Sequence, residues 1–274
     1  MMAGRVVHHL EAGSGRPVVL LHGAGGGAAN WYRLIGPLAT HWRVLAPDLP
    51  GFGLSDPIPL EAPLGLTGAR FLREWLDTVC DGPVAVVGTS FGGLLALRLA
   101  QLAPERVERV VVIDGAGLGR ELPWPVRVAT LPGIGPLALR PSRAGTRALL
   151  QSLLVSDPSP LRDHEAILVD YLWRSAVSGT TAHMVTAVRL FGNLRGQREI
   201  VTDAEMRAIT QPVLVAWGER DRFIPLHHAR HAVATLPRGR LGVIPGAGHS
   251  PNWEAPSELL GIMRPFLEAP LGEL

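Results

Sequence analysis

The chain has 274 residues, 47% of them hydrophobic, which is enough to bury the core of one large domain or of a domain with an insertion. All 26 basic residues are arginines, so chemistry that needs a lysine amine is excluded, including a Walker A phosphate loop and a Schiff base. The formal charge is only +2 and aromatic residues make up 5%, so we expect no nucleic-acid partner.

Cysteine content and the first residues bear on metal binding and on the cellular compartment of the protein. The one cysteine, Cys80, cannot form an internal disulfide or a multi-thiolate metal site, and we expect neither a metal nor a cofactor. Residues 1–15 contain no apolar run followed by a small-residue cleavage site. Glycine, serine and arginine interrupt the most apolar stretch, residues 84–103, which argues against a membrane span. The sequence therefore predicts a cytoplasmic protein.

Short runs rich in β-branched residues alternate with helical patterns along the chain. The expected strands are residues 5–9, 18–22, 43–47, 84–88, 109–114, 213–217 and 241–245. Most are continuously apolar, as is typical of strands buried on both faces. A helix is expected from Thr67, because Phe71 and Trp75 follow at helical spacing. This alternation predicts an α/β fold, with a mostly parallel, doubly wound sheet and helices on both faces.

One connection between expected strands is too long for this pattern. It runs from Asp114 to Val213 and contains helical stretches at residues 143–154, 164–178 and 180–191. A loop of this length without structure would be improbable in a compact domain. The sequence therefore predicts a helical cap at residues 120–208, inserted into a core made of residues 1–119 and 209–274.

A candidate nucleophile lies between an expected strand and an expected helix. Residues 88–93 read GTSFGG, with Ser90 at the centre. A sharp turn between strand and helix exposes a serine hydroxyl above the sheet, and Gly88 and Gly92 remove side chains that would clash there. The pattern predicts Ser90 as the nucleophile.

A serine becomes a good nucleophile only when a base takes its proton, and this turn type implies the chain order serine, acid, histidine. Among ten histidines, His249 is the best candidate because it follows the last expected strand in the flexible run GAGH. The acid should end an intervening strand. Asp221 is the preferred acid and Asp114 is the alternative, whereas Glu219 lies too close to its strand to reach.

A serine nucleophile also needs N–H donors for the oxyanion that it creates. One expected donor is the backbone N–H of Phe91, directly after the serine. The second should come from the glycine-rich residues 22–27, with Ala24 as the donor and Gly25 as the alternative. A dinucleotide site is the competing interpretation of these glycines, but no clear acidic partner follows at the required distance.

Five motifs occur in order: HGAGGG, DLPGFGLSD, GTSFGG, WGERDRFIP and GAGHSPNWEAP. Together they resemble the α/β-hydrolase superfamily across essentially the whole chain. This resemblance implies the α/β-hydrolase fold and a triad of Ser90, Asp221 and His249, but it says little about the substrate.

Within the superfamily, Ser90 stands where haloalkane dehalogenases and most epoxide hydrolases have aspartate, and the absence of lysine disfavours hydroxynitrile lyases. The glycine loop followed by Asn30 and Trp31 is similar to meta-cleavage-product hydrolases, which break a carbon–carbon bond. That family usually has asparagine before the nucleophile and tryptophan after the catalytic histidine, where this chain has Thr89 and Ser250. Cleavage of esters and cleavage of carbon–carbon bonds therefore both stay open.

We expect a carboxylesterase that acts on small to medium acyl esters through an acyl-enzyme. The alternative is a carbon–carbon hydrolase acting on dienoate ketones; a perhydrolase, a lactonase or a non-catalytic ligand-binding member is less favoured. The expected pocket residues are Gly25, Asn30, Trp124 and Trp173, with an N-cap as the other interpretation of Asn30. The expected partners are a small-molecule ester and water, and a homodimer stays open.

Overall fold

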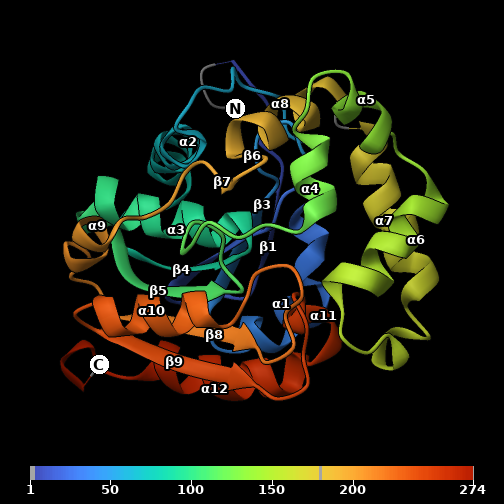
Figure 1. The fold of residues 1–274 in the computed structure, drawn as a ribbon. Helices are drawn as coiled ribbons and strands as arrows, with labels where there is room; N and C mark the ends of the chain where they lie inside the picture. The colour runs from blue at the N-terminus through green and yellow to red at the C-terminus, as the bar shows by residue number, and fades with distance from the viewer. Residues whose placement is uncertain (1–3, 179–180, 274) are drawn as a thin grey trace.

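The computed structural model describes residues 4–178 and 181–273, and a seven-stranded sheet crosses it (Figure 1). The strand order is β1-β3-β2-β4-β5-β8-β9, and every neighbouring pair is parallel except β1 and β3. The strands are β1 (His9–Ala12), β2 (Pro17–Leu21), β3 (Arg43–Pro47), β4 (Val84–Thr89), β5 (Val107–Ile113), β8 (Val213–Gly218) and β9 (Gly239–Ile244).

Six of these strands lie within two residues of their expected limits; five of them have buried apolar runs, whereas β9 is only partly buried. The expectation for the first strand was wrong: β1 covers His9–Ala12, and only His9 lies in the range 5–9. This strand is at the edge of the sheet and pairs only with β3. Its residues are exposed or half-buried, so they form no continuous apolar run that could reveal the strand.

Helices cover both faces of the sheet, which confirms the predicted doubly wound α/β class. One apolar cluster packs α2 (Leu64–Val79), α3 (Phe91–Leu102) and α10 (His227–Thr235) on one face. A second cluster packs α1 (Tyr32–Ala39) and α12 (Pro256–Glu268) on the other. The helix expected from Thr67 begins earlier, at Leu64.

A group of helices between β5 and β8 lies at the right and top of Figure 1, beside the sheet. They are α4 (Trp124–Ala129), α5 (Ile134–Ala138), α6 (Arg143–Leu149), α7 (Glu165–Ser178) and α8 (Thr181–Phe191). The expected stretch 143–154 ends in a π-helical turn, and residue 180 lies outside the described residues. The short hairpin of β6 (Gly192–Asn193) and β7 (Gly196–Gln197) and helix α9 (Asp203–Arg207) complete the connection. We keep the cap limits of 120–208 as a proposal.

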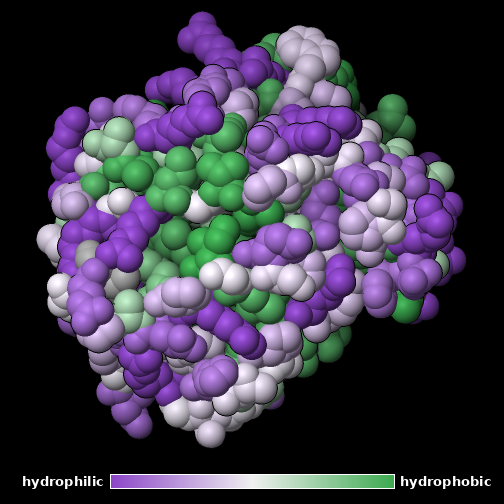
Figure 2. Space-filling model, turned by 90° about the horizontal axis from the view of Figure 1, so that it is seen from below, coloured by the Kyte–Doolittle hydropathy of each residue, from purple (hydrophilic) through white to green (hydrophobic). Residues whose placement is uncertain are grey.

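The lower face of the molecule carries an apolar band. Figure 2 shows apolar side chains gathered in the middle of this face, with polar side chains around them. The edge strand β9, which pairs only with β8, lies at the bottom of Figure 1. The homodimer that the sequence leaves open stays a prediction.

None of the helices in the described ranges combines the length and the apolar character that crossing a bilayer requires.

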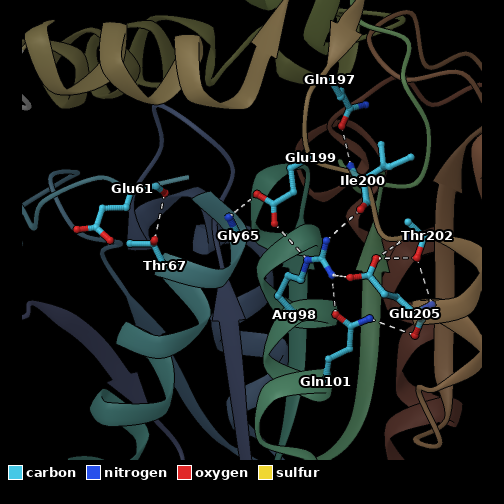
Figure 3. A network of polar contacts seen from close by, with 11 residues as sticks. Glu61, Gly65, Thr67, Arg98, Gln101, Gln197, Glu199, Ile200, Thr202 and Glu205 are labelled. Atoms are coloured by element: carbon cyan, nitrogen blue, oxygen red, sulfur yellow. Dashed lines mark hydrogen bonds and ion pairs between the residues drawn. The ribbon is translucent and has the colours of Figure 1, made fainter. Parts of the chain in front are cut away.

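A buried arginine of α3 ties the chain that returns from the inserted helices to the core (Figure 3). The Arg98 guanidinium donates to Glu199 Oε1 (3.2 Å), Glu205 Oε1 (2.6 Å), Ile200 O (2.9 Å) and Gln101 Oε1 (2.9 Å). Glu199, also buried, accepts the N–H of Gly65 in α2 at 2.7 Å. Glu199 is thus held by α2 and α3 together, and these contacts fix where the chain re-enters the core.

We expect Arg98→Leu to lower the free energy of unfolding by about 3 kcal/mol or more, because Glu199 would stay buried without its cation. The matched control is Arg207→Leu on α9, whose exposed pair with Asp203 spans 3.6 Å and should contribute less than about 1 kcal/mol. Urea unfolding of both variants measures the difference. Equal losses would contradict the role assigned to Arg98.

Candidate active site

The turn that carries Ser90 depends on close approach of backbone atoms. Ser90 follows β4 with φ at 51°, in the left-handed region that non-glycine residues seldom adopt. A Cβ on Gly88 would lie 2.1 Å from the carbonyl oxygen of Gly92, and one on Gly92 would lie 2.1 Å from that of Leu21. Side chains at 88 and 92 would therefore clash, which confirms the physical reason for the glycines on either side of the serine.

The structure brings Ser90, His249 and Asp221 together. His249 Nε2 lies 3.1 Å from Ser90 Oγ, and His249 Nδ1 lies 2.8 Å from Asp221 Oδ2. Asp221 Oδ1 accepts the N–H groups of Phe223 (2.7 Å) and Ile224 (2.9 Å), so its carboxylate is fixed. With the Nδ1 proton donated to Asp221, Nε2 is free to accept the serine proton. This geometry suits base-activated nucleophilic attack.

The other two acids considered from the sequence do not bond to His249. Asp114 follows β5, is fully buried, and accepts the N–H of Gly218 at 2.9 Å through Oδ1. Burial raises the pKa of Asp114 well above its ordinary value, and the negative charge of Asp221 raises it further. Glu219 instead accepts the N–H of Gly246 at 2.9 Å. Only Asp221 is placed to orient the imidazole.

The glycine-rich loop lies against the nucleophile. A Cβ on Gly23 would lie 3.2 Å from Ser90 Cβ, and one on Gly25, where φ is 78°, would lie 3.1 Å from Met184 Cε of α8. The N–H groups of Ala24 and Phe91 form no hydrogen bond within the described part of the chain. Their role as oxyanion donors stays a prediction.

His22 fixes this loop, and the sequence analysis missed it. The ring is fully buried; Leu49 N–H donates to Nε2 at 2.9 Å, so Nδ1 carries the proton and donates to Gly23 O at 2.8 Å. Burial lowers the pKa of His22, which keeps the ring neutral. The histidine that opens the HGAGGG motif was the available signal. Its bonds join the glycine loop to the loop after β3.

Asp48 holds the other end of the loop. Asp48 Oδ1 accepts Ala28 N–H at 2.6 Å, and its Oδ2 accepts Leu54 N–H at 2.9 Å and bonds to His8 Nδ1 at 2.7 Å. Asp48 begins DLPGFGLSD, one of the five motifs that carry the family resemblance. The motif therefore has a structural role, because its first residue, Asp48, anchors the chain that leaves the glycine loop.

Asn30 is buried beside the glycines. A Cβ on Gly26 would meet Asn30 Nδ2 at 2.5 Å, while Asn30 Oδ1 has no hydrogen-bond partner among the described residues. Helix α1 begins at Tyr32 with Trp31 as its N-cap, so the interpretation of Asn30 as an N-cap was wrong. An unpaired buried oxygen next to the loop keeps Asn30 a candidate substrate contact.

The two tryptophans of the expected pocket lie on the inserted helices α4 and α7, and their place in a substrate pocket stays a prediction. Trp124 is 66% exposed at the start of α4. Trp173 packs against Arg143, whose guanidinium carbon lies 4.3 Å from the ring centroid, and lines a cavity of about 490 Å³ beside Asp48. Trp124 opens the six-residue helix α4, whereas Trp173 lies on the longer helix α7.

Other apolar side chains surround the reacting groups. The Phe223 ring stacks on His249 with a centroid distance of 4.7 Å, and Phe91 meets Phe191 of α8 edge to face at 6.1 Å. Met184, also from α8, reaches Gly25. The inserted helix α8 therefore supplies apolar groups on the side of the glycine loop and the nucleophile turn.

One group outside the triad has ligand types suited to a metal: Glu121, His227 and His228. Glu121 bonds to Nε2 of both histidines, at 3.0 Å for His227. The Nδ1 atom of the buried His228 has no partner within the described chain. A metal on Nε2 would require a proton on Nδ1, and this buried N–H would find no acceptor. We therefore assign no metal to this cluster.

We expect the neutral His22 to make folding sensitive to acid. Its pKa is lowered from 6.5 in the folded chain, so the unfolded chain binds the proton first, and stability is lost as the pH falls below about 6.5. His22→Gln should flatten this loss, measured as the free energy of unfolding between about pH 7 and 5. The exposed His41 gives the control, His41→Gln, which should keep the wild-type slope; equal slopes in all three proteins would contradict the assignment.

Comparison with known proteins agrees with this architecture. A family model described as alpha/beta hydrolase fold matches residues 16–256. The chain is 32% identical over 256 residues to 2-hydroxy-6-oxo-6-phenylhexa-2,4-dienoate hydrolase of Burkholderia cepacia, covering 90% of this chain and 86% of the relative.

Two further similarities point the same way. The chain is 32% identical over 252 residues to a 2-hydroxy-6-oxononadienedioate/2-hydroxy-6-oxononatrienedioate hydrolase of Comamonas testosteroni, again covering 90% and 86%. The solved structure of a 2-hydroxy-6-oxo-6-phenylhexa-2,4-dienoate hydrolase from a Rhodococcus species superposes with a TM-score of 0.82 at 25% identity, covering 97% of this chain and 96% of that one. The chain belongs to the α/β-hydrolase family and is a hydrolase.

Proposed function

We propose that this hydrolase cleaves the carbon–carbon bond beside the ketone of a 2-hydroxy-6-oxo-dienoate. The observation that carries the proposal is the 30–32% identity, over most of both chains, to relatives named for this reaction. These relatives favour carbon–carbon cleavage over the ester cleavage that the sequence alone favoured.

The proposed triad suits the bond changes of this reaction. Ser90 Oγ adds to the ketone carbon while its proton passes to His249 Nε2, and Asp221 stabilises the imidazolium. The N–H groups of Ala24 and Phe91 would hold the oxyanion.

Cleavage first requires the substrate to pass to its 2-keto form: the 2-hydroxyl loses its proton and the carbon beside the ketone gains one, which makes that carbon tetrahedral. When the tetrahedral intermediate collapses, the carbon–carbon bond breaks and its electron pair moves through the remaining double bond to the 2-oxo oxygen, which takes the proton from His249. The acyl group stays on Ser90 as an ester. Water, losing its proton to His249, then releases the acid and restores the serine.

The apolar groups near the triad support a conjugated or aromatic substrate. Phe91, Phe191 and Met184 offer apolar surface beside the nucleophile turn and the glycine loop. Flat apolar side chains favour planar ligands through burial and ring stacking. An aryl ketone joined to a diene has this shape.

Ester hydrolysis is the second candidate function. Thr89 and Ser250 stand where the carbon–carbon hydrolases of this family usually carry asparagine and tryptophan. The acyl-transfer steps would be the same, except that an alkoxide leaves in place of a carbon. Leaving-group preference therefore separates the two candidates.

We expect kcat/KM for 2-hydroxy-6-oxo-6-phenylhexa-2,4-dienoate to exceed that for p-nitrophenyl butyrate by about tenfold or more, equal to about 1.4 kcal/mol of transition-state binding. Ser90→Ala should lose about 10⁴-fold or more on both substrates, because the triad acts as a unit. Faster turnover of the ester would favour the second candidate. Full activity of Ser90→Ala would contradict both.

A further inference from the structure

Asp114 is a buried carboxyl beside the triad, and the steps above give it no task. It is fully buried, and its φ of 45° lies in the left-handed region. Asp114 Oδ1 accepts the Gly218 N–H, while Oδ2 has no partner among the described residues. One carboxyl oxygen each of Asp114 and Asp221 and a ring nitrogen of His249 lie within 4.8 Å of one another. A buried carboxyl with one unpaired oxygen therefore stands next to the triad acid.

Two neighbouring carboxyls in a buried site cannot both be ionised at low cost. Asp221 is well suited to be the anion, because two backbone N–H groups and His249 Nδ1 donate to it. Asp114 accepts from a single donor. The proton therefore belongs on Asp114, and the unpaired Oδ2 is the oxygen that can carry it.

The other titratable groups around this pair do not reverse that assignment. Glu254 of α11 (Pro251–Glu254) is buried, and its charge further disfavours ionisation of Asp114. His228 of α10 is buried, and burial lowers its pKa, so its ring favours the neutral form and offers no positive charge that would stabilise an ionised Asp114. No arginine forms an ion pair with Asp114 in the ranges that the structure describes.

We propose that Asp114 is a positioning residue of the triad, a neutral acid whose Oδ2–H donates to the Asp221 carboxylate and limits how strongly Asp221 holds the protonated His249. A donor that shares the charge of Asp221 weakens its attraction for the imidazolium. The serine is then activated at a lower pH than it would be without this donor. The inference rests on the proposed triad but not on the identity of the substrate.

Two substitutions separate the hydrogen bond from the backbone conformation. Asparagine tolerates a positive φ, can keep the bond to Gly218 through its oxygen, and replaces the O–H by an N–H donor. Glycine tolerates the same φ but removes the donor. Asp114→Asn should therefore keep the hydrogen-bond donor to Asp221 that Asp114→Gly loses.

The first test measures the rate of inactivation by a fluorophosphonate between about pH 5 and 9, because this probe reports serine activation whatever the natural substrate is. We expect the acid limb of the Asp114→Gly profile to lie about one pH unit higher than that of the wild type, a tenfold slower reaction on the acid side. The Asp114→Asn limb should stay close to the wild type. The inference would be overturned if the profiles of Asp114→Gly and the wild type coincided. It would also be overturned if the Asp114→Asn profile were shifted as far as that of Asp114→Gly.

The second test needs only the wild type and Asp114→Asn. A wild-type Asp114 that keeps its proton when folded must release it on unfolding above about pH 4. The wild type should therefore lose stability relative to Asp114→Asn as the pH rises. Its unfolding equilibrium constant should increase tenfold relative to that of the variant for each pH unit over which the folded Asp114 keeps its proton. A difference that does not change with pH would show an ionised Asp114 and overturn the inference.

The two tests also separate this inference from the proposed function. Wild-type labelling that disappears in Ser90→Ala, with no shift in the Asp114 variants, would leave the triad standing and remove only the role of Asp114. Labelling that persists in Ser90→Ala would remove the triad and this inference with it.

Discussion

The close approach of backbone atoms around Ser90 is the constraint on which the rest of the site depends. A side-chain carbon on Gly88 would lie 2.1 Å from the carbonyl oxygen of Gly92, and one on Gly92 would lie 2.1 Å from that of Leu21. Strand β4 can therefore meet helix α3 only with glycine at 88, and α3 can meet the end of β2 only with glycine at 92. Their packing forces Ser90 into a left-handed conformation and lifts its hydroxyl above the sheet. The burial of β4 on both faces offsets the cost of this conformation.

Buried polar groups form a second layer of organisation around that turn. His22 and Asp48 hold the glycine loop through backbone N–H and carbonyl groups, and Arg98 holds the chain that returns from the inserted helices. Asp114 and Asp221 lie beside His249. Each of these groups needs its partners because an unpaired polar atom is costly where water is excluded. The proposed neutral Asp114 follows the same rule, since a proton turns an unpaired acceptor into a donor.

Much of this arrangement could be predicted from the sequence, for physical reasons that differ among its parts. Strands such as β4 and β8 are buried on both faces, so their apolar runs reveal them. The edge strand β1 has no such run, and its predicted position was wrong. Chain order and turn chemistry indicated Ser90 and His249, but the choice between Asp221 and Asp114 depended on a hydrogen bond that only three dimensions show. Trp124 is 66% exposed, and its pocket role stays a prediction because composition cannot say which side of a short helix faces the substrate.

Covalent catalysis by this triad requires that Ser90 carries the acyl group of the substrate during turnover. Rapid quenching of the wild-type enzyme during turnover of 2-hydroxy-6-oxo-6-phenylhexa-2,4-dienoate, followed by mass spectrometry of the intact chain and its peptides, tests this directly. We expect a benzoyl adduct on the peptide that contains Ser90, formed and lost at rates that match turnover. Turnover without any adduct, in an experiment fast enough to detect one, would mean that water attacks the ketone directly and that Ser90 is not the nucleophile.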